Sequence, residues 1–124
     1  MYFNMSDLVL DQIEAQIHSH RVILYMKGTP YSPQCGFSAR VAEVLMKHQL
    51  DMGYVDVIAH PDIRQWLPEH SGWPTFPQIF IDEELIGGCD ILCEIEKSGE
   101  LTKIIAQQKL VKNKQITDAT KETV

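Results

Sequence analysis

Apolar residues follow two different spacings in the first quarter of the chain. Val9, Ile13 and Ile17 recur every fourth position, which is the spacing of one face of a helix, and Ser6 can cap its N-terminus. Residues 22–26 form one unbroken apolar run instead, as expected for a strand that is buried on both faces. The pattern therefore predicts an amphipathic helix followed by a central strand.

The rest of the chain continues this alternation of helices and strands. Segments with helical spacing are separated by short apolar runs and by Gly- and Pro-containing loops. The further predicted helices cover about residues 37–48, 61–70, 90–97 and 100–108. The further predicted strands cover residues 54–58, 78–81 and 84–86, the last two joined as a hairpin.

This element order predicts one α/β domain over residues 1–110. A helix joins the first two strands, so they should lie parallel with a right-handed crossover, and the hairpin should add antiparallel strands. The expected architecture is a small four-stranded mixed sheet flanked by helices on both faces. Residues 111–124 are polar, and we expect them to form a disordered tail.

Composition narrows the possible functions. The chain has 124 residues, a formal net charge of -6 and a pI of about 5.2, which argues against a nucleic-acid partner. No apolar run reaches the roughly 20 residues that span a bilayer, and no secretory signal is visible. We expect a cytoplasmic protein without a membrane partner.

Three cysteines are the main candidates for chemistry: Cys35, Cys89 and Cys93. Their number is odd and no pair has the C-x-x-C spacing, so neither a disulfide scaffold nor a self-contained zinc site is favoured. One reactive thiol in a reducing compartment is the better hypothesis.

Cys35 stands where a loop becomes a helix. Free backbone N–H groups and the helix dipole favour an anion there, so the pKa of this thiol should be lowered, and Lys27 would add positive charge. The alternative is that Cys35 is a small buried apolar residue. Three positions later, Ser38 stands where a dithiol oxidoreductase has its second cysteine, so Cys35 needs an external thiol.

Four motifs together closely resemble the monothiol glutaredoxin family, in its short single-domain form. They are Lys27-Gly-Thr-Pro30, Cys35-Gly-Phe-Ser38, Trp73-Pro-Thr-Phe-Pro-Gln78 and Gly87-Gly-Cys-Asp90. The resemblance implies a thioredoxin fold, glutathione binding and a [2Fe-2S] cluster bridged between two subunits. It also implies BolA-like partners and a role in carrying or storing clusters.

The resemblance also implies roles for individual residues. Cys35 would ligate iron or bind glutathione covalently. The remaining glutathione contacts would come from Lys27, Arg64, Thr75, Phe76, Pro77, Cys89 and Asp90.

The residues themselves support these glutathione contacts to different degrees. The segment before Pro77 suits strand-like pairing with an extended peptide, whether Pro77 is cis or simply begins a strand. Helix-start amides near Asp90 suit a carboxylate, and Asp90 can also be a simple cap. Arg64 is a single arginine in a predicted helix, and such a residue is usually just solvated.

Counting ligands links glutathione to the cluster. A [2Fe-2S] cluster usually has four thiolate ligands. Two chains would supply two Cys35 thiolates, and two glutathione molecules would complete the set in a homodimer. Cys89 and Cys93 are alternative ligands; a core position is favoured for Cys93, the role of Cys89 stays open, and a Cys35–Cys89 disulfide is a further alternative.

Three functions follow, in this order of preference. The first is an iron–sulfur carrier that delivers clusters to apo iron–sulfur proteins. The second, a companion activity, is a regulatory pairing with a BolA-like protein. The third is a glutathione-dependent thiol transferase acting through Cys35 alone, so an efficient oxidoreductase is less favoured than a carrier.

Overall fold

The central sheet has five strands in the computed structural model, which describes residues 4–121. The strand order is β6-β5-β1-β4-β7. β1 is parallel to β4 and antiparallel to β5, and β5 and β6 form the hairpin. The strands are β1 (Val22–Met26), β4 (Met52–Asp56), β5 (Gln78–Ile81), β6 (Glu84–Gly87) and β7 (Ile116–Asp118). The predicted mixed sheet and the thioredoxin fold are confirmed, but the predicted number of four strands is one too few, because β7 adds a fifth.

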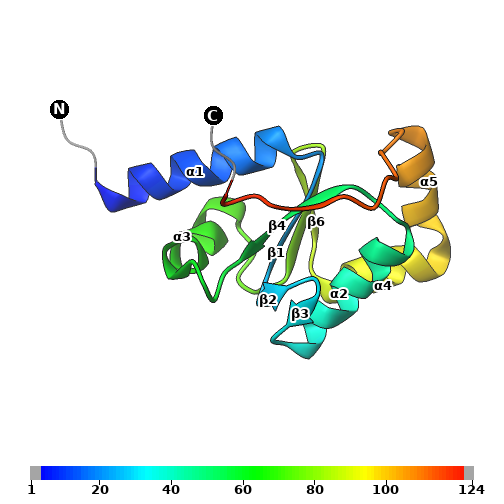
Figure 1. Cartoon of the computed structure of the whole chain (residues 1–124), viewed down its shortest axis with the longest axis horizontal. Helices are drawn as coiled ribbons and strands as arrows, with labels where there is room; N and C mark the ends of the chain where they lie inside the picture. The colour runs from blue at the N-terminus through cyan, green and yellow to red at the C-terminus, as the bar shows by residue number, and fades with distance from the viewer. Residues whose placement is uncertain (1–3, 122–124) are drawn as a thin grey trace.

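Helices cover both faces of this sheet (Figure 1). Two of them, α1 (Met5–Ser19) and α3 (Pro61–Ser71), pack on one face. The other face is covered by α2 (Gly36–Lys47), α4 (Cys89–Ser98) and α5 (Glu100–Gln107). The carboxyl end of β1 therefore lies between the starts of α2 and α3, where the chain can bring polar side chains together.

β1 is the middle of the core because both of its faces are apolar. Leu24 and Met26 point toward α2 and α4, whereas Ile23 and Tyr25 point toward α1 and α3. Tyr25 is fully buried, and its hydroxyl donates a hydrogen bond to Gln16 Oε1 at 2.8 Å. A buried polar group is thus satisfied within the apolar layer.

Of two predicted helix ends, one is wrong and one is confirmed. Asn4, and not Ser6, caps α1, because the Asp7 amide donates to Asn4 Oδ1 at 3.0 Å and Ser6 already lies inside the helix. The prediction that Ser6 is the cap is wrong. Gly99 ends α4 in the left-handed conformation, with φ of 85°, as a glycine does most easily.

The predicted loop before Cys35 contains a small hairpin, β2 (Gly28–Thr29) with β3 (Ser32–Pro33). Gly28 has φ of +90°, and its amide donates to Asp56 Oδ1 at 2.9 Å. The Gln34 amide donates to the Lys27 carbonyl at 2.9 Å. These bonds fix the loop between β1 and α2, and with it the position of Cys35.

The prediction of a disordered tail is wrong for the residues that form β7. β7 extends the sheet parallel to β4. Asp51 anchors the approach to β7, since its Oδ1 accepts hydrogen bonds of 2.9 Å from the amides of Asn113 and Gln115. Ala119, just beyond β7, is buried. This added strand covers an edge that would otherwise present unpaired backbone groups.

We expect Asp51→Ala to free β7 without unfolding the domain. Hydrogen bonds from two amides to a charged oxygen would be lost, so exchange of the Ala119 amide, which bonds to the Tyr54 carbonyl, should accelerate by roughly tenfold or more. Hydrogen exchange followed by NMR checks this. Asp51→Asn, which keeps an acceptor oxygen, is the matched control; equal protection in Asp51→Ala and the native chain would contradict the anchoring role.

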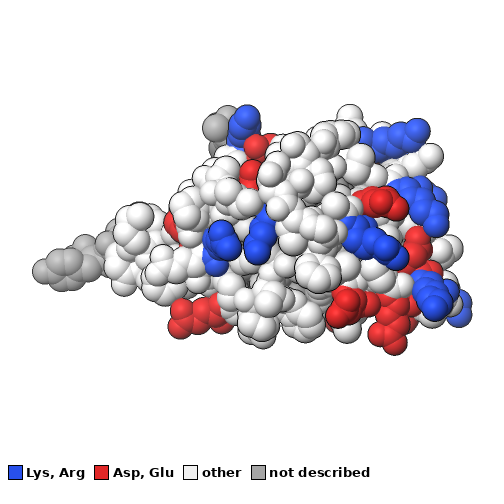
Figure 2. Space-filling view, turned by 90° about the horizontal axis from the view of Figure 1, so that it is seen from below, with Lys and Arg blue, Asp and Glu red and all other residues white. Residues whose placement is uncertain are grey.

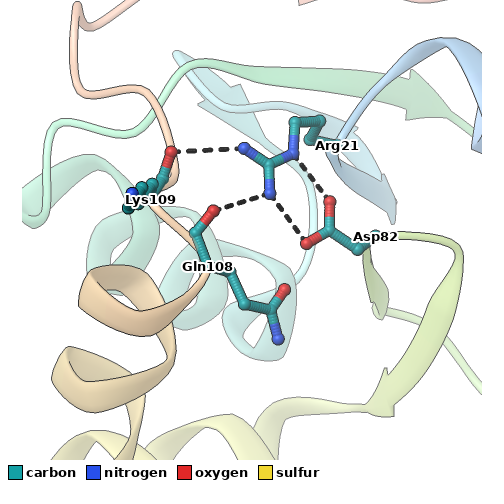
Figure 3. A network of polar contacts seen from close by, with 4 residues as sticks. All are labelled: Arg21, Asp82, Gln108 and Lys109. Carbon is teal, nitrogen blue, oxygen red and sulfur yellow. Dashed lines mark hydrogen bonds and ion pairs between the residues drawn. The ribbon is translucent and has the colours of Figure 1, made fainter.

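A polar network joins the end of α5 to the sheet (Figure 3). It lies at the end of the sheet that is away from the predicted site. The Arg21 guanidinium donates to both Asp82 carboxylate oxygens, at 2.7 and 2.9 Å. It also donates to the carbonyls of Lys109 and Gln108, at 3.2 and 2.7 Å. Arg21 thereby joins the start of β1, the β5–β6 turn and the chain after α5.

Glu96 connects α4 to the end of α2. Its carboxylate lies 2.7 Å from His48 Nε2 and 3.4 Å from Lys47 Nζ, and these partners hold the pKa of Glu96 below its ordinary value, the His48 hydrogen bond most of all. A carboxyl with a lowered pKa in the folded state stabilises the protein above its unfolded pKa. That stabilisation is lost as the pH falls through the folded pKa.

Glu96→Gln should therefore lower the free energy of unfolding by about 0.5–1 kcal/mol at neutral pH. The difference from the native chain should shrink as the pH falls below about 4, because Glu96 is then protonated in the native chain as well. Urea unfolding at several pH values measures this. Glu94→Gln, an exposed position on the same helix, is the control, and a difference that does not depend on pH would contradict the assignment.

Candidate functional site

All eight residues predicted for the site line one cleft of about 740 Å³. The cleft lies at the carboxyl end of β1, between the starts of α2 and α4, α3 and the loop before β5. These eight residues are Lys27, Cys35, Arg64, Thr75, Phe76, Pro77, Cys89 and Asp90. Segments up to 63 positions apart in the sequence are thus brought to one place by the fold.

Cys35 is the N-cap residue of α2 and is partly exposed in the cleft. The pKa of its thiol is lowered, first by the backbone N–H of Ser38 and then by that of Phe37, by the positive charge of Lys27 and by the Ser38 hydroxyl, while burial opposes them. The alternative of an inert buried cysteine is wrong. A helix start that presents N–H groups to sulfur favours a thiolate.

Ser38 has a structural part in this arrangement beyond replacing a second cysteine. Its side chain is fully buried, and its Oγ accepts a hydrogen bond of 3.1 Å from the Lys27 amide. The hydroxyl proton is then available to Cys35. Ser38 thus joins the end of β1 to the first turn of α2 directly beneath the thiol.

We expect Ser38→Ala to raise the pKa of Cys35 toward its ordinary value, because the hydroxyl that stabilises the thiolate is removed. The backbone N–H of Ser38 remains, so the rise should be partial. Thiolate absorption and the rate of alkylation as functions of pH measure it. Ser98→Ala, at the far end of α4, should leave both unchanged; an unchanged Cys35 titration in Ser38→Ala would contradict the proposed contact.

The wall opposite Cys35 is built from the loop before β5 and the start of α4. The Phe76–Pro77 peptide bond is cis, one of the two alternatives left open by the sequence. Gln78 is fully buried, and its Nε2 donates to the Trp73 carbonyl at 2.9 Å. A Cβ at Gly88 would lie 3.2 Å from both the Pro77 carbonyl oxygen and Trp73 Nε1, so a glycine allows these segments to meet.

The cleft also includes residues that sequence reasoning alone does not select. Phe37 is 63% exposed and Ile91 is 37% exposed, so both present apolar surface at its rim. The sequence allows Trp73 to be either core or a partner surface, and in the structure it lines the cleft wall. The additional lining residues are Phe37, Pro68, Trp73, Pro74, Gly88 and Ile91. The position of Phe37 two residues after Cys35 was the available signal.

Charge on this side of the molecule differs from the net charge of the chain. Figure 2 shows the molecule from below the view of Figure 1: some Lys and Arg atoms lie near the middle of a largely uncharged area, and others lie toward the margins together with most of the acidic atoms. Lys27 and Arg64 both line the cleft. Asp90 adds one negative charge to these two positive ones, so the three side chains together carry a charge of +1 in a chain whose net charge is -6, and an anionic ligand would meet positive charge there.

Cys89 differs chemically from Cys35. Burial, followed by contact with Cys93, raises the pKa of Cys89 to about 11, and the two sulfur atoms lie 3.9 Å apart. Cys93 is partly buried, and all three cysteines are free thiols. Of the two cysteines that line the cleft, Cys35 is therefore the one whose thiol ionises more readily.

Comparison with known proteins agrees with this geometry. The profile of the glutaredoxin family matches residues 22–86. Glutaredoxin 4 of Haemophilus influenzae (strain 86-028NP) is 51% identical over 98 residues, which are 79% of this chain and 92% of that protein. The chain belongs to the glutaredoxin family. With Ser38 in place of a second cysteine, this glutaredoxin is of the monothiol type.

Solved structures extend the comparison of this glutaredoxin. Reduced apo GrxS14 of poplar, a solution structure, is 42% identical, with a TM-score of 0.70, and the match covers 80% of this chain and 91% of that one. A buckwheat glutaredoxin–glutathione complex has a TM-score of 0.73 at 20% identity, covering 86% and 96%. The second likeness supports the fold. Among residues 4–121, no helix of this glutaredoxin is long and apolar enough to cross a membrane.

Proposed function

We propose that this glutaredoxin binds glutathione in its cleft and that two chains together hold a [2Fe-2S] cluster as cargo. Its role would be the biogenesis, storage or transfer of clusters to apo iron–sulfur proteins. The observation that supports this most is the lowered pKa of Cys35 in a cleft where Ser38 occupies the position of a resolving cysteine. Such a thiolate is a good ligand and depends on an external thiol.

The cleft suits glutathione in size and charge. Its volume of about 740 Å³ lies within the roughly 300–1,000 Å³ of small-molecule sites. Lys27 and Arg64 would attract a carboxylate, and the backbone of residues 75–77 would pair with the extended tripeptide. The amides of Cys89 and Asp90, at the start of α4, would receive the γ-glutamyl carboxylate. The buckwheat glutaredoxin described as a glutathione complex has the same fold.

The donor set also fits a shared cluster. Cys35 supplies one thiolate, whereas a [2Fe-2S] cluster usually takes four. Two chains and two glutathione molecules complete this number, so cluster binding and a homodimer go together. Half of the ligands would then be exchangeable small molecules, which favours delivery over permanent electron transfer.

Exposed apolar side chains beside Cys35 support the proposal that partners bind on this side of the molecule. Phe37 and Tyr31 are 63% and 73% exposed, and both lie within a few residues of the thiol. A second copy of the chain would cover this surface around a shared cluster, and a BolA-like protein would replace one copy in a regulatory heterodimer. A reducing compartment such as the cytoplasm would keep Cys35 and glutathione as thiols.

Omitting glutathione tests this proposal. Apo-protein incubated anaerobically with ferrous iron and sulfide should become a brown dimer only when glutathione is present, as judged by absorption and by sedimentation. Dithiothreitol at the same thiol concentration is the control for simple reduction. A cluster-bound monomer, or a dimer that forms equally well without any glutathione, would contradict the shared-ligand arrangement.

Thiol transfer is a second candidate function, because a thiolate-favouring Cys35 can also attack a glutathionylated disulfide. The sulfur of Cys35 would displace the substrate thiolate and retain the glutathione as a mixed disulfide. A second glutathione would then have to be oriented for attack. The rate at which the protein removes glutathione from a glutathionylated peptide distinguishes the carrier from the transferase. A rate equal to that of a dithiol glutaredoxin favours the transferase.

A further inference from the structure

Two sulfur atoms outside the reactive position lie close together on α4. Sγ of Cys89 is 3.9 Å from Sγ of Cys93, one helical turn later. Cys89 lines the cleft, and both residues are partly buried free thiols. The proposed function uses the sulfur of Cys35 and only the backbone of Cys89, so it leaves both α4 sulfurs without a role.

We propose that Cys89 and Cys93 form a binding site for a soft monovalent metal ion of the Cu(I) class. Thiolate sulfur is a soft ligand that favours soft metals, Cu(I) among them. With metal–sulfur bonds of about 2.3 Å, as in zinc thiolates, a separation of 3.9 Å corresponds to a sulfur–metal–sulfur angle of about 115°. That angle is close to a trigonal arrangement, with the third position available to a small thiol entering from the cleft.

The number of ligands argues against other metals. Within residues 4–121, no group of three or more His, Cys, Asp or Glu side chains is arranged to hold a metal ion. A structural zinc ion takes four protein ligands, and hard ions such as Mg²⁺ and Ca²⁺ take oxygen. Two sulfurs one helical turn apart suit an ion that is satisfied by two or three soft ligands.

The surroundings act in opposite directions on the negative charge that binding would create. Cu(I) would replace one proton on each thiol, so two sulfur–copper bonds form, two protons are released and the site acquires a charge of −1. No electron is transferred. Burial and the charge of Asp90 disfavour an anion at Cys89, whereas Arg40 of α2 is a nearby positive charge that favours it, and the positive charge of the bound ion would itself offset one of the two thiolates. Packing of Cys89 against the apolar cluster beneath α4 would shield the soft ion from water.

Competition with a chromogenic Cu(I) chelator tests the site. The full chain, Cys35→Ser, Cys89→Ala and Cys93→Ala are reduced, freed of reductant and titrated with Cu(I) and bathocuproine disulfonate without air. The native chain and Cys35→Ser should bind one Cu(I) per chain. Cys89→Ala and Cys93→Ala should each lose at least about tenfold in affinity, since each removes a direct ligand. X-ray absorption should show sulfur neighbours alone.

Two results would overturn the inference: native affinity in Cys93→Ala, or loss of binding in Cys35→Ser, which would place the copper at Cys35. Cys93→Ser, which preserves the size of the side chain, replaces Cys93→Ala if the latter fails to fold by circular dichroism. Glutathione binding by Cys93→Ala is measured in parallel. Because Cys93 lies outside the proposed glutathione contacts, normal glutathione binding with lost copper binding separates the two proposals.

Discussion

Cys35→Ser should reduce the amount of [2Fe-2S] cluster bound after reconstitution by more than about tenfold, because it removes the one cluster ligand that each chain is proposed to supply. A serine hydroxyl stays protonated near neutral pH and is a poor ligand for iron in a sulfur environment. The start of α2 lowers the pKa of the Cys35 thiol, but it cannot make a serine hydroxyl ionise near neutral pH. Visible absorption, with iron and sulfide analysis, measures the loss.

The matched control is Cys93→Ala, which removes a thiol that is not proposed as a ligand of the cluster. It should bind a normal amount of cluster and remain a glutathione-dependent dimer. If Cys35→Ser kept a normal cluster while Cys93→Ala lost it, the ligand assignment would be wrong and the α4 thiols would be the cluster ligands.

Gly28→Ala should strongly destabilise the folded domain. Gly28 has φ of +90°, and a Cβ there would lie 2.5 Å from the Ser32 carbonyl oxygen and 2.7 Å from the Gln34 amide nitrogen. Both atoms belong to the backbone of the β2–β3 hairpin and the residue after it, so they cannot rotate away. We expect a loss of about 2–4 kcal/mol in the free energy of unfolding, measured by urea denaturation.

Gly28→Ala should also weaken glutathione binding, since Gly28 follows Lys27 and its hairpin leads into Cys35. Gly36→Ala is the control: a Cβ there meets nothing within 4 Å, and alanine is favoured over glycine in a helix by up to about 1 kcal/mol. Equal unfolding midpoints for both variants would contradict the role given to the hairpin backbone.

The central part of the fold could be predicted because its signals are local. β1 is an unbroken apolar run, and the β5–β6 hairpin has two apolar runs around a polar turn, so period and composition were sufficient. β7 has only three residues, Ile-Thr-Asp, with no such signal. It is a strand because Asp51, 62 positions before Asn113, accepts hydrogen bonds from the approaching chain.

The candidate site, too, could be predicted only where its signals are local in the sequence. The motifs selected Cys35 and its neighbours, and the fold brings them into one cleft. A single arginine in a helix has no distinctive pattern, so the prediction of Arg64 as a site residue rests mainly on the family resemblance. The hydrogen bond from the Lys27 amide to Ser38 Oγ, and the 3.9 Å approach of Cys89 to Cys93, depend on packing and were visible only in three dimensions.

The most direct test of the shared-cluster proposal is the composition of protein purified without air. The account predicts a brown dimer that contains one [2Fe-2S] cluster for every two chains and one glutathione per chain, determined by iron, sulfide and thiol analysis of the same sample. A cluster-containing protein from which no glutathione is released on denaturation would contradict it.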